Sequence, residues 1–306
     1  MALPSDMRGS LFMVISMAGF SINDSMTKLA SAEMNPGQVM LIRGVFATIL
    51  IGLLAWQQGA LRVPKLAFHP LVMTRVASEI LATASFLIGL AHLPLANSSA
   101  ILQTLPLSVT LGAAIFLGEP IGWRRLLAIA IGFAGVLLIV RPGFEGFNFF
   151  ALFTLASVLL CTVRDLSTSR APSQIPSSLI SFVTSAFVML AGGVLMVPMG
   201  GWQTPRLEIV GALSFAAFMV LIGYQFVIMA MRSGNVSAVA PFRYTSLLWS
   251  ITLGFLIFGD LPDLPMIVGS VIIVLSGIYT LLRERRVSRE KPATASTGST
   301  MAPDGV

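Results

Sequence analysis

The chain has 306 residues, of which 56% are hydrophobic and only 10% are charged, and its mean hydropathy is +0.88. A soluble globular domain has about a quarter of its residues charged, so this chain lacks the polar groups to cover its surface in water. The net charge of +6 therefore indicates the ends of membrane spans rather than nucleic-acid binding. Cys161 is the single cysteine, and His69 and His92 lie far apart, which excludes a disulfide framework and argues against a metal site.

Ten apolar runs of membrane-spanning length follow one another along the chain. A hydrocarbon core of about 30 Å needs roughly 20 residues of helix, and the runs lack the alternation of barrel strands. Turn-forming residues separate them. They cover residues 10–31, 38–57, 71–91, 97–118, 124–140, 148–168, 178–198, 208–231, 236–258 and 264–282. The predicted fold class is an all-α membrane protein with ten transmembrane helices, in which the first run is a retained span and not a signal peptide.

Lysine and arginine residues near the span ends indicate the orientation. With the N-terminus inside, most of them fall on the inner side, whereas only Arg141 and Arg206 fall on the outer side. Both termini are therefore predicted to lie in the cytoplasm. Lys28, Arg43 and Arg243 belong to neither side, because they lie within spans.

The first half of the sequence matches the second half at a shift of 141 residues. Residues 11–30 align with residues 152–171, which pairs Asp24 with Asp165, and Gly118-Glu119 aligns with Gly259-Asp260. Each half has five spans, an odd number, so the second half enters the membrane from the opposite side. Inverted repeats of this kind are typical of alternating-access carriers, whose site lies between the halves. Chance similarity between apolar helices is the alternative, against which the polar matches argue.

Several motifs resemble the drug/metabolite transporter superfamily, and within it the EamA-type carriers with ten spans. They are LGAAIFLGEP (111–120), LGFLIFGDLP (253–262), RPG (141–143) and SAVAPFRYTSLLWSITLGFLIFGDLPD (237–263). The resemblance covers residues 8–285 and implies an EamA-type repeat over 1–141 and a second over 142–286. Residues 287–306 are polar and low in complexity, and we expect a disordered cytoplasmic tail.

Within the superfamily, NDSMTK (23–28) and PFRYTSLLW (241–249) are most similar to a bacterial branch of riboflavin and S-adenosylmethionine importers. The resemblance implies a multi-pass protein of the bacterial inner membrane that takes up riboflavin, with S-adenosylmethionine uptake, or amino-acid or drug efflux, as alternatives. It implies a small-molecule substrate within a lipid bilayer, and no cofactor. The scaffold alone does not fix the substrate, and the direction of transport, coupling ion and oligomeric state stay open.

Charged residues within spans one to three are candidates for substrate binding, because a charge at bilayer depth normally faces the interior of the bundle. Asp24 and Lys28 share one helix face, and a short connection brings Arg43 near them. This cluster either binds substrate or fastens the two spans together, with Lys28 reaching outward. Arg75 and Glu79 are also four residues apart, and Glu79 is either the salt-bridge partner of Arg75, which we favour, or a protonatable group.

The ninth span offers a second set of candidates. Arg243, Tyr244 and Trp249 follow Pro241, which removes a backbone hydrogen bond. The two rings are suited to stacking a planar substrate and Arg243 to binding a carbonyl, carboxylate or phosphate. An aromatic belt at the membrane interface, with Arg243 reaching to water, is the alternative. Gln103 and Tyr224 add neutral hydrogen-bonding groups. We interpret Arg164 and Asp165 of the sixth span mainly as interface charges.

The pattern favours a carrier over an enzyme or a channel. A carrier is favoured by the inverted repeat and by unlike polar groups inside spans of both halves. An enzyme is not predicted, because neither the histidines nor Cys161 have suitable partners in sequence. A channel is disfavoured because the polar groups do not form a ring of identical residues.

Overall fold

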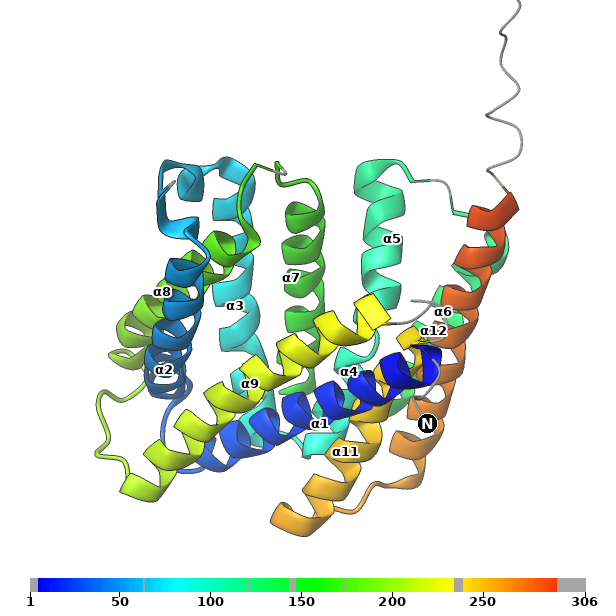
Figure 1. Cartoon of the computed structure of the whole chain (residues 1–306). Coiled ribbons are helices and arrows are strands. Elements are labelled where there is room, and N and C mark those ends of the chain that lie inside the picture. Colours follow the sequence, from blue (N-terminus) through cyan, green and yellow to red (C-terminus); the bar gives the residue numbers. More distant parts are fainter. Residues whose placement is uncertain are drawn as a thin grey trace, which may run out of the picture.

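The computed structural model describes residues 5–62, 64–119, 121–142, 147–172, 174–233 and 239–290, and within these ranges the chain is helical without a β-strand (Figure 1). The elements of the first half are α1 (Ser5–Ser31), α2 (Pro36–Gln57), the short 3₁₀ turns η1 (Ala60–Arg62) and η2 (Pro64–Phe68), α3 (Pro70–His92), α4 (Leu95–Leu102), α5 (Leu105–Leu117) and α6 (Trp123–Val140). Those of the second half are α7 (Ala151–Ser169), α8 (Ser177–Met196), α9 (Leu207–Ser233), η3 (Ala240–Tyr244), α11 (Thr245–Leu253), η4 (Gly254–Phe258) and α12 (Leu264–Glu290).

Among the described residues, each of the ten predicted spans contains helix. In this part of the chain, eight of them are long and apolar enough to cross a membrane, counting α4 and α5 together. The other two are α1, whose hydropathy is lowered by Asn23, Asp24 and Lys28, and the segment 240–258, which is divided into short helices. α12 continues to Glu290, so residues 287–290 of the predicted tail are helical, and the rest of that prediction, residues 291–306, lies outside the described residues.

The fourth and ninth spans are interrupted, which the sequence analysis did not predict. The fourth breaks between α4 and α5, where Pro106 in the first turn of α5 has no amide hydrogen to continue the ladder. The described part of the ninth contains the 3₁₀ turn η3, which includes Pro241, and it ends as the π-helix η4. The breaks fall at equivalent positions of the two halves, because Thr104 aligns with Thr245.

The two halves pack against each other in a pattern that follows the internal repeat. α1 packs along α9 and α3 along α7, while α2 packs on α8 and α6 on α12. Since α7 is the counterpart of α1 and α9 that of α3, the first two contacts are equivalent. Figure 1 shows α1 and α9 side by side as they cross the bundle obliquely. The major helix contacts therefore join the halves, which confirms an architecture of two repeats.

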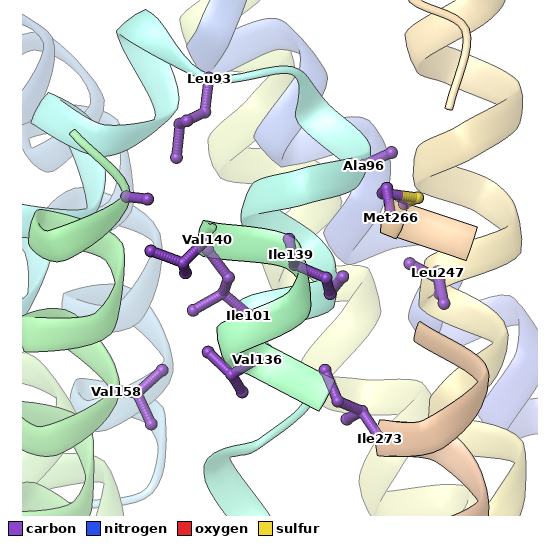
Figure 2. Packing of buried hydrophobic residues seen from close by; sticks show 12 residues of the cluster. Leu93, Ala96, Ile101, Val136, Ile139, Val140, Val158, Leu247, Met266 and Ile273 are labelled. Atoms are coloured by element: carbon purple, nitrogen blue, oxygen red, sulfur yellow. The ribbon is translucent and has the colours of Figure 1, made fainter. Parts of the chain in front are cut away.

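The largest hydrophobic cluster illustrates this interleaving. It contains Ile101 of α4, Val136 of α6, Leu247 of α11 and Ile273 of α12, all of them buried. Figure 2 shows these side chains converging from helices of both halves. Neither half therefore forms this part of the core alone.

Glycines allow the closest helix crossings between the halves. A Cβ atom on Gly269 of α12 would meet the carbonyl oxygen of Gly135 of α6 at 2.6 Å, and one on Gly37 of α2 would meet the backbone nitrogen of Met196 of α8 at 2.4 Å. Backbone atoms cannot move aside as side-chain ends do. Small residues at such crossings are typical of membrane helix packing.

We expect Gly37→Ala to destabilise the protein by about 1–3 kcal/mol, the usual cost of overpacking, because α2 and α8 must separate. The measurement is the thermal unfolding midpoint of the purified protein in detergent. Gly211→Ala is the matched control, because a Cβ atom there has no neighbour within 4 Å. Equal midpoints for the two variants would contradict the close α2–α8 crossing.

Candidate functional site

Polar and charged side chains from five helices meet inside the bundle. α1, α2 and α3 of the first half and α7 and α9 of the second half contribute them. We call this set the central cluster, and it consists of Asn23, Asp24, Arg43, Glu79, Arg164 and Tyr224. Three of the predicted candidates on spans one to three, Asp24, Arg43 and Glu79, are therefore brought together, along with Tyr224 from span eight.

Asn23 links the acidic and the basic member of the first two helices. Its side-chain nitrogen donates to Oδ1 of Asp24 at 2.9 Å, and its Oδ1 accepts from Nη1 of Arg43 at 3.5 Å. Asp24 and Arg43 also attract each other electrostatically. Asn23 is buried, whereas Asp24 and Arg43 are partly exposed. The two charged groups thus keep accessible surface while an amide bridges them.

Glu79 pairs with Arg164 across the two halves. Oε2 of Glu79 lies 3.0 Å from Nη1 of Arg164, and Nε of Arg164 lies 2.7 Å from Oδ1 of Asp165. The predicted ion pair with Arg75 is wrong, because Arg75 instead donates to the hydroxyl of Thr168 at 3.1 Å. Close packing of α3 on α7 presents Arg164 at the level of Glu79. Arg164 therefore contributes to a contact between the halves, which the interpretation of Arg164 and Asp165 as interface charges did not include.

Tyr224 borders the cluster with an exposed ring. Its side chain is 56% exposed, although it lies within electrostatic range of Glu79, Arg164 and Asp165. An exposed ring that faces charges from neighbouring helices indicates an accessible space inside the bundle rather than a lipid-facing position. Phe20 of α1 supports Tyr224 edge-on, with ring centroids 5.2 Å apart at 84°.

Lys28 does not join Asp24 and Arg43, contrary to the predicted cluster of these three residues. Its Nζ donates to the carbonyl oxygen of Leu93 at 2.5 Å, lies 3.4 Å from Oδ2 of Asp260, and sits 4.9 Å from the centroid of the Phe258 ring. Lys28 lies one turn beyond Asp24 on α1, where the helix faces the ends of α3 and η4 instead of α2. Lys28 therefore contributes to a contact between the halves at one end of the bundle.

Gln103 connects the breaks of the fourth and ninth spans. Its side-chain nitrogen donates to Oγ of Ser246 at 2.8 Å and to the carbonyl oxygen of Arg243 at 3.3 Å. The side chain of Arg243 is exposed. Three buried serines from α1, α4 and α11 continue this polar contact, namely Ser21, Ser99 and Ser250.

The two other aromatic candidates of the ninth span lie in packed surroundings. Tyr244 is buried, and its hydroxyl occupies the space above Gly277 of α12. Trp249 is partly buried against a cluster that includes Met13 and Met17. The structure does not bring the two rings together as the walls of one planar slot.

Sequence reasoning undervalued the contribution of the sixth span. The repeat alignment pairs Asp165 with Asp24, and this is the signal that points to Arg164 and Asp165 as members of the interior. Ser21, Ser99 and Ser250 were missed altogether, because single serines in apolar helices carry no distinctive spacing.

Comparison with known proteins identifies relatives over nearly the whole chain. An S-adenosylmethionine uptake transporter of Rickettsia prowazekii is 24% identical, with 95% of this chain and 98% of the relative covered. A riboflavin transporter of Rhizobium johnstonii is 28% identical, with 72% of each chain covered. A solved structure, titled only as the crystal structure of a protein, superposes with a TM-score of 0.63 at 16% identity, covering 91% of this chain and 98% of the other.

The family model agrees with the internal repeat. The model of the EamA-like transporter family matches twice, over residues 7–141 and over residues 148–282. These matches are offset by the same shift that relates the two halves of the sequence, and together they leave only the ends and a short connection uncovered. The chain is therefore a multi-pass membrane protein that belongs to the EamA-like transporter family.

Proposed function

We propose that the chain is a secondary carrier of the bacterial inner membrane that takes up a small metabolite. The two repeats, 1–141 and 142–286, rock against each other and expose a site between them alternately to the two sides. Two features support this mechanism: the pairing of every major helix with a partner of the other half, and the charged groups at their interface. The excess of Lys and Arg at one set of span ends supports cytoplasmic termini.

The observation that carries the proposal is the central cluster itself. Two carboxylates and two guanidinium groups stay partly exposed around the ring of Tyr224. They belong to Asp24, Glu79, Arg43 and Arg164. Ion pairs that only stabilise the fold are expected to be fully buried against one another, because a charge at this depth is costly. Charges that retain accessible surface are suited to a ligand that is itself charged.

We propose S-adenosylmethionine as the first candidate substrate. It has a carboxylate, which suits Arg43, and it has an amino group and a sulfonium cation, which suit Asp24 and Glu79. Its adenine ring suits the exposed face of Tyr224. The relative that takes up this compound is similar to the chain over nearly its full length, which supports the same substrate.

Riboflavin is the second candidate, although the sequence motifs placed it first. The planar slot expected from Tyr244 and Trp249 is not assembled, and a largely neutral flavin makes little use of four charged groups. Tyr224 and Phe20 still provide an aromatic surface for its ring, and a riboflavin transporter is among the relatives. The two substrates therefore differ in which groups of the central cluster they need.

The substrate is tested by uptake of radiolabelled S-adenosylmethionine into liposomes that contain the purified protein. We expect uptake above that of protein-free liposomes, with competition by unlabelled S-adenosylmethionine and weak competition by riboflavin. Saturable uptake of labelled riboflavin without uptake of S-adenosylmethionine would reverse the order of the candidates. Absence of both would reject the substrate proposal.

Asp24→Asn tests the charge recognition, because asparagine keeps the shape but loses the charge. We expect the KM for S-adenosylmethionine to rise at least about tenfold, the size of a lost charge-assisted hydrogen bond. Arg124→Gln is the matched control, since Arg124 is exposed beside Trp123 and lies outside the cluster. An unchanged KM in Asp24→Asn would remove Asp24 from the site.

A further inference from the structure

Equivalent ends of the two repeats are in different states in this structure. The repeat alignment pairs Gly118-Glu119 with Gly259-Asp260 and Ser169 with Lys28. Gly118 and Gly259 both have a left-handed backbone, with φ of 68° and 72°, so the two helix ends turn in the same way. Glu119 and Asp260 therefore leave their helices in equivalent positions, and their contacts can be compared directly.

The end of the bundle that contains Lys28 is closed. Lys28 of the first repeat contacts Asp260 and Phe258 of the second, with side-chain exposures of 13% for Lys28 and 30% for Asp260. At the same end, Glu33 pairs with Arg206.

Hydrogen bonds between uncharged groups also join the two repeats at this end. Asn35 donates to the carbonyl oxygen of Gly201 at 2.9 Å, and Gln38 and Gln203 exchange hydrogen bonds between the side chain of Gln38 and the backbone of Gln203. Polar links between the repeats thus extend across this end.

The opposite end contains a cavity at the equivalent place. α5 and α7 touch in their deeper parts, where the hydroxyl of Thr162 donates to that of Ser108 at 2.7 Å. Toward this end, residues of α5 and α7, together with Ile121 just before α6 and Arg125 in its first turn, line a cavity of about 200 Å³. Its lining includes Leu117, Glu119 and Ser169, which are the counterparts of Phe258, Asp260 and Lys28.

We propose that Glu119 and Ser169, with Leu117 beside them, form a second gate that closes this cavity when the contact between Lys28 and Asp260 opens. This assignment rests on the alternating-access mechanism proposed above. In the opposite state of the carrier, each repeat takes the tilt that the other has here. Glu119 then approaches Ser169 as Asp260 now approaches Lys28. The cavity is then the path by which substrate leaves or enters at the end predicted to face the cytoplasm.

The two gates differ in strength because their residues differ in charge. Lys28 and Asp260 form an ion pair, whereas Ser169 offers Glu119 only a hydroxyl donor. Between these counterpart residues, the contact at the Lys28 end is therefore the stronger one. This imbalance gives a direct test, because a lysine in place of Ser169 supplies the missing partner. Arg125 and Asp165 also line the cavity, and they are unchanged in the variants compared below.

The test is the rate at which a water-soluble maleimide labels Thr110→Cys, a position in the cavity lining, in the full-length detergent-purified protein with Cys161→Ser. We expect Ser169→Lys to slow the labelling about fivefold relative to Ser169→Gln, the size expected of one partly exposed ion pair. Adding Glu119→Gln to Ser169→Lys is expected to restore the rate. Size-exclusion profiles identify variants that do not fold.

Two results would overturn the gate. One is equal labelling of Ser169→Lys and Ser169→Gln, which would show that Glu119 does not approach position 169. The other is slow labelling that persists after Glu119→Gln, which would indicate simple obstruction by the longer side chain. As a second variant, Asp260→Asn is expected to slow labelling by weakening the opposite gate. The labelling requires no substrate, so failure of S-adenosylmethionine uptake is distinguished from failure of the gate.

Discussion

Charged side chains within a bilayer must find partners inside the protein, because each costs roughly 3 kcal/mol or more when it faces hydrocarbon. Asp24, Arg43, Glu79 and Arg164 come from four different helices. In the part of the chain that the structure describes, the opposite charges one turn from Asp24 and Glu79, Lys28 and Arg75, contact other groups instead. The interleaved packing of the halves brings the first four together. The charged residues can therefore be accommodated at this depth because the packing of the two repeats supplies their partners.

The same interleaving explains why interruptions are tolerated where they occur. The breaks in the fourth and ninth spans leave backbone groups without helical partners, which lipid does not satisfy. Here Gln103 reaches from one break to the carbonyl oxygen of Arg243 at the other, and buried serines surround the contact. In the proposed alternating-access mechanism, these breaks also allow the two halves to tilt without disrupting continuous helical hydrogen bonding.

The span boundaries and the repeat followed from sequence because both depend on local properties: length, apolarity and a fixed shift. The pairing of individual charges did not follow. Lys28 lies on the face shared with Asp24, but only the positions of α3 and η4 decide that it contacts Leu93 and Asp260. Glu79 was matched with its sequence neighbour Arg75, whereas Arg164 of α7 is the partner. Contacts between distant helices are set by tertiary packing, which spacing along one helix does not encode.

The sequence also does not indicate which of the two equivalent ends of the repeats is closed. The alignment shows that Glu119 corresponds to Asp260 and Ser169 to Lys28, but it does not show which pair is in contact. The structure has one contact closed and the other opened by a cavity. A carrier needs this difference, since it must present one site to two sides in turn.

The proposed transport mechanism requires that the central cluster borders a water-accessible space inside the bundle. Spin labels at Tyr224→Cys and at Phe218→Cys, in the Cys161→Ser background and in lipid bilayers, test it directly by their relaxation with a water-soluble nickel complex and with oxygen. We expect the label at 224 to respond mainly to the nickel complex, while the label at the exposed apolar position 218 responds mainly to oxygen. A label at 224 that responds only to oxygen would place Tyr224 in lipid and rule out a water-accessible space at the central cluster.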